Sequence, residues 1–465
     1  MHQAAEPDGA DASTWPAPAA NGPVRARLRL PGSKSMTNRA LILAAIADAP
    51  TEIANPLRAR DTLLMASALC ALGASIQDAP DGWSVAPGPM DHGAQVDVGN
   101  AGTVMRFVPP VAPLATGDVA LHGDPRAAQR PVQPLIAALR TLGADIDDGG
   151  RGAIPFTVRG TGHLGGGPVT LDASASSQLV SGLLLAGSRY DKGLEVRHHG
   201  PPVPSAPHIA MTVGMLRDAG AEVEVEEQGS ATGQLRPRPD TWRVYPGPLR
   251  PGTVRVEPDL VNSAPFLAAA LVTAGTVTIA EWPARTTQPA SHIVDLLTRM
   301  GATCALTGDG LTVTGTGTIS GVTADLRDSS ELAPVLTAVA ALASSPSVFT
   351  GIGHMRTHET DRLAALATQI NALGGDVTEL PDGLEIRPRP LAADGLFASY
   401  DDHRMVMAAA VLGLAVPGIR VQNAATVAKT FPDFTAMWGK MLGRAPEAGQ
   451  DFQPNGAAAD VEERN

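Results

Sequence analysis

Residues 25–47, RARLRLPGSKSMTNRALILAAIA, combine an alternating strand, a glycine turn and an apolar helix that opens on basic and hydroxyl side chains. A second helix is predicted from about Asp61 to Gly73, because glycine suits the left-handed residue that ends a helix. Pro80-Asp81-Gly82 then gives a hairpin signal between two short apolar strands. The pattern predicts a unit of two helices and four strands, with its first strand at residues 25–30.

The unit recurs six times, and two markers show the repeat. A glycine that ends the second helix returns about every 70–80 residues, at Gly73, Gly143, Gly220, Gly301, Gly374 and Gly443. First helices open at a similar spacing, near Asn38, Thr103, Ser176, Ser263, Glu331 and His403. Second helices are predicted at 61–73, 134–142, 208–219, 292–300, 361–373 and 433–442. Six repeats of this length divide most naturally into two α/β domains of three.

Composition limits the partners. A net charge of −12 argues against nucleic acid, whose phosphates need a broad basic face. Cys70 and Cys304 have no His or Cys at ligand spacing, so neither a disulfide framework nor a metal site is predicted. No apolar run reaches the roughly 18 residues of a membrane span, and no secretory signal is visible. We expect a cytoplasmic protein with no cofactor, no metal and no membrane partner, and with disordered tails at residues 1–22 and 446–465.

Cationic side chains at helix openings are the first functional signal. The N-terminus of a helix is already partly positive, so Lys or Arg there is disfavoured by about 0.3–1 kcal/mol. Arg39, Arg106 and Arg404 nevertheless stand in or near first turns, and Lys34 precedes the first of them. One such arginine is usually a solvated surface residue, whereas three at equivalent repeat positions favour an anion-binding site.

The motifs around these openings carry hydroxyl, amide and basic groups. Gly32-Ser-Lys-Ser35 looks like the end of a phosphate-binding loop, but position 27 is Arg27 instead of the required glycine, which excludes a phosphate-loop kinase. Taken singly, the other motifs read equally well as turns, helix caps or surface charge. They are Gly99-Asn-Ala-Gly-Thr-Val-Met-Arg106, Gly123-Asp-Pro-Arg-Ala-Ala-Gln-Arg-Pro131, Ser174-Ala-Ser-Ser-Gln178, His358-Glu-Thr-Asp-Arg362, Asp401-Asp-His-Arg404 and Lys429-Thr-Phe-Pro432.

In combination, these motifs resemble the 5-enolpyruvylshikimate-3-phosphate synthase family over residues 24 to 442. The resemblance implies two inside-out α/β barrel domains, each of three βαβαββ repeats, with helices inside, sheets outside and a two-strand hinge. The first domain would contain residues 23–33 plus 257–445 and the second residues 34–256, with chain crossings near 31–34 and 250–258. The resemblance also implies a monomer that closes on two small substrates without a cofactor.

The resemblance implies transfer of the enolpyruvyl group of phosphoenolpyruvate to the 5-hydroxyl of shikimate 3-phosphate. The expected shikimate 3-phosphate ligands are Lys34, Ser35, Arg39, Ser176, Ser177, Gln178, Ser205, Glu331 and His358. The expected phosphoenolpyruvate ligands are Lys34, Gly102, Arg126, Gln178, Arg362, Arg404 and Lys429. The expected catalytic groups are Glu331, Glu359, Lys34 and His403. Glu359 matches the general acid at the methylene carbon, and Glu331 the carboxylate that handles the hydroxyl; because Gly102 is retained, inhibition by glyphosate is also expected.

Some positions depart from the family pattern, and two other functions compete. Glu331 stands where many relatives have Asp, His354 and His358 where relatives often carry Asn and Lys, and Phe107 where a proline is common. A UDP-N-acetylglucosamine enolpyruvyl transferase would typically carry a reactive Cys in the 126–131 loop, and neither cysteine lies there. A non-catalytic anion-binding paralogue would gain nothing from Glu331 and Glu359. The balance between burial, which raises the pKa of Glu359, and the cations, which lower it, is open from sequence.

Overall fold

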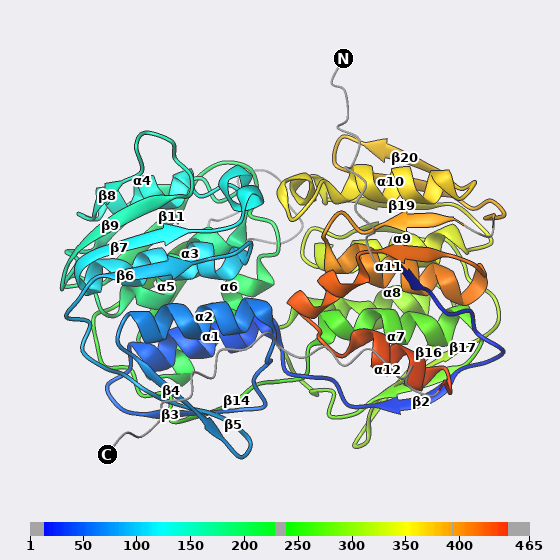
Figure 1. Ribbon diagram of the computed structural model, residues 1–465, viewed down its shortest axis with the longest axis horizontal. Helices are drawn as coiled ribbons and strands as arrows, with labels where there is room; N and C mark the ends of the chain where they lie inside the picture. The colour runs from blue at the N-terminus through cyan, green and yellow to red at the C-terminus, as the bar shows by residue number, and fades with distance from the viewer. Residues whose placement is uncertain (1–13, 228–238, 393–394, 445–465) are drawn as a thin grey trace, which may run out of the picture.

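Two separate hydrophobic cores divide the computed structural model, which describes residues 14–227, 239–392 and 395–444. One core, here lobe I, draws on residues 17–30 and 260–441, and the other, lobe II, on residues 40–256. The lobes lie side by side, lobe II on the left of Figure 1 and lobe I on the right. We infer that the domain bounds expected from the sequence, residues 23–33 plus 257–445 and residues 34–256, correspond to lobe I and lobe II.

Three helices form the centre of each lobe. Because α3 and α9 are buried along their entire lengths, their surfaces are apolar on almost every side. In lobe II the central helices are α1 (Lys34–Ala45), α3 (Gly102–Val111) and α5 (Ser177–Gly187). In lobe I they are α7 (Leu260–Val272), α9 (Ala333–Ala341) and α11 (His403–Ala415). α9 is preceded by the short 3-10 turn η4 (Ser330–Leu332), so the helix predicted near Glu331 begins in two steps.

A second helix follows in every repeat, and the predicted spans are met within one or two residues. These helices are α2 (Arg60–Ala71), α4 (Gln133–Thr141), α6 (Pro207–Asp218), α8 (Ile293–Arg299), α10 (Arg362–Ala372) and α12 (Phe434–Met441). All six glycines that mark the repeat have positive φ angles, from 70° at Gly443 to 108° at Gly301. The glycine marker is therefore confirmed as a helix-terminating residue.

The sheets lie outside the helices and share one strand order. The first two strands of a repeat pair in parallel, and the hairpin that follows adds its fourth strand next to the second. Three sheets follow this order within one repeat. They contain β6 (Ala94–Asp97), β7 (Thr116–His122), β8 (Asp145–Asp147) and β9 (Phe156–Thr161); β10 (Gly167–Leu171), β11 (Leu194–His198), β12 (Val223–Glu227) and β13 (Pro239–Val244); and β18 (Thr323–Asp325), β19 (Ser347–Thr350), β20 (Asp376–Leu380) and β21 (Gly383–Arg387).

The strand predicted to open the first repeat, at residues 25–30, is exchanged between lobes, which corrects the prediction that it pairs within that repeat. β2 (Arg25–Leu28) pairs in parallel with β15 (Thr276–Ile279) of lobe I, beside β16 (Ala302–Thr307) and β17 (Gly310–Gly315). Its place in lobe II is taken by β14 (Thr253–Arg255), parallel to β3 (Thr51–Ala54) and followed by β4 (Ser75–Ala79) and β5 (Gly82–Ala86). Side-chain alternation predicts a strand but does not specify the edge with which it pairs.

The two chain crossings between the lobes lie against each other. Gly32 and Pro258 form an isolated antiparallel bridge, the amide of Ser33 donates to the carbonyl of Glu257 over 2.8 Å, and the amide of Asp259 donates to the carbonyl of Pro31 over 2.9 Å. A Cβ at Gly32 would lie 2.0 Å from the carbonyl oxygen of Asn55, so only glycine fits. Both crossings are immediately followed by a central helix, α1 or α7.

The N-terminal segment corrects a second prediction. Residues 14–22 do not form a disordered tail, because β1 (Thr14–Pro16) pairs antiparallel with β23 (Arg420–Gln422), beside β22 (Leu396–Ala398). β1 fills the position that a hairpin strand occupies in the other sheets, and the Trp15 ring meets Phe434 edge-on at 6.4 Å. The tails expected at 1–13 and 446–465 lie outside the described residues. So does most of the polar stretch at 226–240, which the sequence predicts to be a surface loop near a domain junction.

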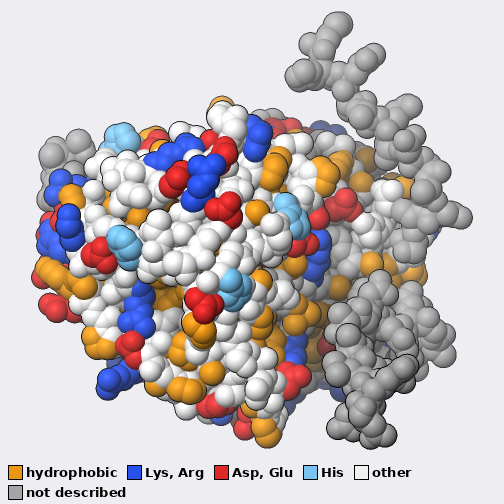
Figure 2. Space-filling view, turned by 60° about the vertical axis from the view of Figure 1, so that its left-hand side comes forward, with side chains coloured by type: hydrophobic (Ala, Val, Ile, Leu, Met, Phe, Trp, Pro, Cys, Tyr) orange, Lys and Arg blue, Asp and Glu red, His pale blue; other side chains and the backbone are white. Residues whose placement is uncertain are grey.

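The surface view shows mixed charges on the face that it presents. Basic and acidic side chains alternate over lobe II in Figure 2, without a broad basic face in that view. Across the described residues, no helix combines the length and apolar character needed to cross a membrane.

Candidate active site

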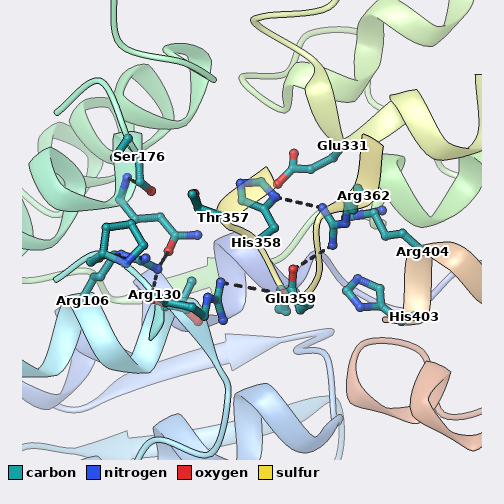
Figure 3. Close-up of a pocket in the computed structure, with 16 residues that line it drawn as sticks. Arg106, Arg130, Ser176, Glu331, Thr357, His358, Glu359, Arg362, His403 and Arg404 are labelled. Atoms are coloured by element: carbon teal, nitrogen blue, oxygen red, sulfur yellow. Dashed lines mark hydrogen bonds and ion pairs between the residues drawn. The ribbon is translucent and has the colours of Figure 1, made fainter. Parts of the chain in front are cut away.

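A pocket between the lobes gathers side chains from both of them (Figure 3). Helices α1, α3 and α5 of lobe II and helices α10 and α11 of lobe I all present their N-terminal ends to it. Aligned peptide dipoles make such ends partly positive, so their convergence favours anions. The pocket is lined by Lys34, Gly102, Thr103, Arg106, Arg130, Pro131, Ala175, Ser176, Gln178, Glu331, Thr357, His358, Glu359, Arg362, His403 and Arg404.

The lining is strongly cationic although the chain as a whole is acidic. Five Lys or Arg side chains face two carboxylates there, Glu331 and Glu359. Like charges at this density repel one another, and burial adds to the cost: it lowers the pKa of Arg106 to about 9, with Arg130 adding to the effect. An anionic ligand would relieve both penalties.

Glu359 lies among three cations, and its side chain is only 9% exposed. Its Oε2 accepts a hydrogen bond from Arg362 Nη2 at 2.8 Å, while Oε1 lies 3.8 Å from Lys429 Nζ and 3.9 Å from Arg130 Nη2. Burial alone would raise the pKa of Glu359, but Arg362, Arg130 and Lys429 outweigh it and hold the pKa well below its usual range. Without ligand, Glu359 is therefore an anion at neutral pH.

Glu331 occupies the η4 turn on the other side of the pocket. Its Oε2 lies 3.9 Å from His208 Nε2, and this oxygen is buried with no hydrogen-bond partner among the described residues. Burial again favours the neutral form, yet His208, Arg404 and Lys34 outweigh it and lower the pKa of Glu331. A buried, ionised carboxylate with an unsatisfied oxygen is suited to accept a proton from a bound hydroxyl group.

Arg362 is fixed by a network that begins at Asp402. Its Nε donates to Asp402 Oδ2 over 2.7 Å and its Nη2 to Asp402 Oδ1 over 3.2 Å, while Nη1 donates to His358 Nδ1 over 3.0 Å. The last bond requires an unprotonated Nδ1, and burial together with Arg362 holds the pKa of His358 well below its usual value. The neutral ring therefore keeps its remaining proton on Nε2.

Lys34 joins the two lobes at the start of α1. Its Nζ lies 3.1 Å from Asp61 Oδ2, and its amide donates over 3.1 Å to Asp259 Oδ2 in lobe I. Asp61 is almost fully buried, and its Oδ1 has no partner among the described residues. Lys34 also borders a second, smaller pocket together with Ser35, His208, Glu331 and Arg404.

Three predicted ligands lie behind the lining of the main pocket. Arg39 is 1% exposed and donates to Thr212 Oγ1, Ser181 Oγ and two carbonyls, among them that of Ser35. Ser177 is buried beside its neighbour Ser176, whose Oγ caps α5 by accepting from the Gln178 amide. Ser205, with a φ of 50°, crosses to lobe I: its amide donates to the Arg327 carbonyl over 2.9 Å, and its Oγ lies 3.3 Å from Ser330 Oγ.

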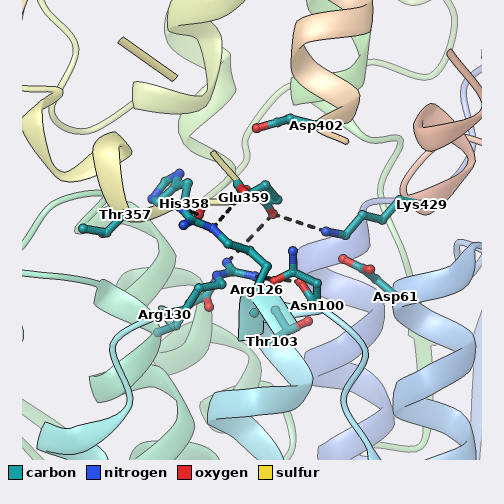
Figure 4. A network of polar contacts seen from close by, with 12 residues as sticks. Asp61, Asn100, Thr103, Arg126, Arg130, Thr357, His358, Glu359, Asp402 and Lys429 are labelled. Carbon is teal, nitrogen blue, oxygen red and sulfur yellow. Dashed lines mark hydrogen bonds and ion pairs between the residues drawn. The ribbon is translucent and has the colours of Figure 1, made fainter. Parts of the chain in front are cut away.

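Arg126 and Lys429 reach the Glu359 end of the site without lining the pocket itself (Figure 4). Arg126 crosses from lobe II and donates through Nε to the Glu359 carbonyl over 3.1 Å and through Nη2 to the His358 carbonyl over 3.2 Å. Lys429 ends the η6 turn (Ala424–Lys429) and contacts the Glu359 carboxylate as described above. Both basic groups are thus within reach of a ligand held at Glu359.

His403 has two ring nitrogens without a hydrogen bond in the described part of the chain, although Nδ1 lies 3.6 Å from Asp402 Oδ1. The side chain is 1% exposed, and neither Nδ1 nor Nε2 has a hydrogen-bond partner among the described residues. Burial, with the nearby Arg404 and Lys34, keeps the pKa of His403 well below its usual value. His354, the other unusual histidine, lies outside the pocket and pairs Nε2 with Ser330 Oγ at 3.0 Å; burial lowers its pKa to about 4.

Four groups of the site were not among the ligands expected from the sequence, although Arg106 was one of the helix-opening arginines that indicated an anion site. Arg106 donates to Gln178 Oε1 at 3.0 Å and to the Pro131 carbonyl, and Arg130 donates to Asn100. Both arginines stood inside motifs already singled out, so position within a motif was the signal. Asp61 and Thr357 had no comparable signal, because a helix-opening acid and an exposed threonine are common. The described residues contain no group of three potential metal ligands.

The architecture and the pocket define a class of protein: a two-lobed, inside-out α/β transferase fold with an anion-binding cleft. The sequence profile of the EPSP synthase (3-phosphoshikimate 1-carboxyvinyltransferase) family matches residues 18–438, so the chain belongs to that family of transferases. It is 48% identical over 441 residues to a 3-phosphoshikimate 1-carboxyvinyltransferase from Kocuria rhizophila, covering 92% of this chain and 96% of the relative.

Solved structures of related enzymes share the fold of this chain. An EPSP synthase from Acinetobacter baumannii superposes with a TM-score of 0.72 at 26% identity, over 91% of this chain and 97% of that one. The enolpyruvyl transferase NikO from Streptomyces tendae shares the fold, with a TM-score of 0.69 at 20% identity, over 91% and 96% of the two chains.

Proposed function

We propose that this protein transfers the enolpyruvyl group of phosphoenolpyruvate to the 5-hydroxyl of shikimate 3-phosphate and releases phosphate, in the shikimate pathway to chorismate. The observation that carries the proposal is the pair Glu331 and Glu359 in one cation-lined pocket between the lobes. Two carboxylates are what an addition followed by an elimination needs for its proton transfers. A protein that only bound anions would lose affinity by having them there.

The substrates bring two phosphates and two carboxylates into one cleft. At 4–6 Å, each pair of like charges repels by roughly 3–4 kcal/mol at an effective dielectric constant near 20. We assign phosphoenolpyruvate to the Glu359 end, where Lys34, Gly102, Arg362 and Arg404 line the pocket and Arg126 and Lys429 adjoin it. We assign shikimate 3-phosphate to the Glu331 end, with Ser176, Gln178 and His358 in the lining, Ser35 in the smaller pocket, and Arg39, Ser177 and Ser205 in support.

The reaction then follows from the two carboxylates. In the addition, the 5-hydroxyl oxygen of shikimate 3-phosphate bonds to C2 of phosphoenolpyruvate while Glu331 accepts the hydroxyl proton. Glu359 gives a proton to C3 in the same step. In the elimination, the ionised Glu359 takes a proton back from C3 as the bond between C2 and the phosphate oxygen breaks, and Glu331 returns its proton to the departing phosphate. The double bond is restored and both carboxylates regain their starting states. The negative groups of phosphoenolpyruvate offset the cations that keep Glu359 ionised, so its pKa rises as the substrate binds. Lys34 and His403 face the same space and stabilise the charge that develops.

Three further properties are part of the proposal. The protein is inhibited by glyphosate at the phosphoenolpyruvate end, beside Gly102. It acts as a monomer, because both carboxylates and all the basic groups of the site come from one chain. It works in the cytoplasm, in keeping with its two free cysteines.

Phosphate release tests the proposal. Purified protein is assayed with phosphoenolpyruvate, with and without shikimate 3-phosphate, and the assay is repeated with Glu359→Gln and with the control Glu385→Gln, a partly exposed side chain of β21 that does not line the pocket. Release should require both substrates and fall by about 100-fold or more in Glu359→Gln only. Release that instead requires UDP-N-acetylglucosamine would make the alternative transferase correct, and binding of both substrates without release would indicate a non-catalytic paralogue.

A further inference from the structure

Asp402 is a carboxylate at the active site with no role in the reaction just described. It is fully buried, at 0% exposure, and it lies directly before the first residue of α11. Its Oδ1 accepts from the Arg404 amide at 2.9 Å, which caps the helix. Both oxygens also accept from Arg362, through Nε at 2.7 Å and through Nη2 at 3.2 Å.

A capping role alone does not explain this geometry. Asp361 caps α10 in the same way, through a bond from the Ala364 amide, but its other contacts are to Arg356 at the surface. Asp402 instead accepts hydrogen bonds from Arg362, the arginine that also contacts Glu359. One atom, Arg362 Nη2, lies 3.2 Å from Asp402 Oδ1 and 2.8 Å from Glu359 Oε2. The two carboxylates therefore share one guanidinium group.

We propose that Asp402 is a positioning residue that competes with Glu359 for Arg362 and so allows Glu359 to take up the proton that it delivers to C3. This inference rests on the proposed enolpyruvyl transfer. Two effects act in the same direction. The Asp402 charge neutralises part of the Arg362 charge, and it repels a negative charge on Glu359. Without it, Glu359 would hold its negative charge more firmly, and less of the enzyme would carry the proton at a given pH.

The surroundings of Glu359 explain why this competition matters. Arg362 faces it from α10, Arg130 from the loop after the 3-10 turn η2 (Pro125–Gln129), Lys429 from η6 and His403 from α11. His358 adjoins it in the chain, Arg126 binds its carbonyl, and the pocket also contains Lys34, Arg106, Arg404 and Glu331. Among the described residues, Asp402 is the other buried carboxylate bonded to Arg362. Figure 3 shows Arg362 against Glu359, and Figure 4 shows Asp402 on the same side of the site as Glu359.

The test is the pH dependence of turnover with both substrates saturating, in wild type and in Asp402→Asn. The limb that falls at high pH reports loss of the proton from the general acid in the bound complex. In Asp402→Asn its midpoint should move to lower pH by about one unit or more. Asp361→Asn, a helix-capping carboxylate beside the site, should leave the midpoint at its wild-type position.

A second variant guards against misfolding. Asp402→Ser keeps a good capping oxygen without the charge and should show the same downward shift, whereas Asp402→Glu keeps the charge and should restore the wild-type midpoint even with a lower rate. A uniform loss of rate with an unmoved midpoint in both Asp402→Asn and Asp402→Ser would overturn the inference and leave Asp402 a structural cap. Absence of turnover in wild type would instead refute the proposed function.

Discussion

At the scale of single residues, the charge state of each group in the pocket depends on the charged side chains packed against it. Glu359 is the clearest case. From the sequence, burial was expected to raise its pKa and the cations to lower it. In the structure the cations prevail, and the pKa of Glu359 lies below its usual value. Its identity was predictable from the Glu-Thr-Asp-Arg motif. Its charge state was not, because that depends on Arg130 and Lys429, which are far away in the chain.

Gly102 gives the first prediction. A Cβ there would lie 2.7 Å from Arg130 Nη2, 2.9 Å from Arg106 Nη1 and 3.0 Å from Gln178 Oε1, so a methyl group must displace charged side chains. In Gly102→Ala we expect KM for phosphoenolpyruvate to rise about tenfold or more, since small displacements in a site are costly, and inhibition by glyphosate to weaken further still. Gly214→Ala, in open space on α6, should change neither. Equal glyphosate inhibition of Gly102→Ala and wild type would contradict the assignment.

Stability against acid gives the second prediction. The pKa of Glu359 in the folded protein lies below the ordinary value of 4.5, so its contribution to the free energy of unfolding is present above about pH 4.5 and is lost as the pH falls through the folded pKa. Glu359→Gln should therefore lower that free energy by about 3 kcal/mol at pH 7, because it leaves buried cations unpaired.

Urea unfolding of wild type and Glu359→Gln at several pH values between 3 and 7 would check this. The difference between the two proteins should shrink towards the acid end. A difference that is constant across that range would mean that folding does not lower the pKa of Glu359, and would contradict the prediction.

At the scale of elements, the repeat pattern predicted the helices well and the strand pairing less well. Helix ends carry local signals such as the six positive-φ glycines. Strand partners are chosen by tertiary packing, and so β2 was assigned to the wrong repeat and β1 was taken for disorder. Trp15 was the overlooked signal for β1, because an aromatic ring is unusual in a disordered segment.

β1 gives the third prediction. Trp15→Ala removes the ring that packs against Phe434 and weakens the pairing of β1 with β23. We expect the free energy of unfolding to fall by about 1–3 kcal/mol, below the cost of emptying a fully buried site because Trp15 is partly exposed. Trp15→Phe, which keeps an aromatic ring, should lose less. Thermal unfolding followed by circular dichroism would measure both, and an unchanged Trp15→Ala would show that β1 contributes nothing to lobe I.

At the scale of the whole molecule, the two lobes form one site. The pocket takes Gly102 and Ser176 from lobe II and the two carboxylates, Glu331 and Glu359, from lobe I, and Arg126 reaches across to the Glu359 carbonyl. Cationic helix openings predicted an anion site in general terms. The contributions of Arg106 and Arg130, and the position of Arg39 behind the lining, depend on how six repeats pack around one cleft, which no local pattern encodes.

The proposed reaction depends on Glu359 protonating C3 of phosphoenolpyruvate before phosphate leaves. Running the reaction in deuterium oxide tests this step, because C3 then passes through a methyl group that carries solvent deuterium. We expect deuterium in the vinyl group of the product, seen by proton NMR and mass spectrometry, and no such product from Glu359→Gln. A product formed at the normal rate without vinyl deuterium would contradict the addition and elimination proposed for this site.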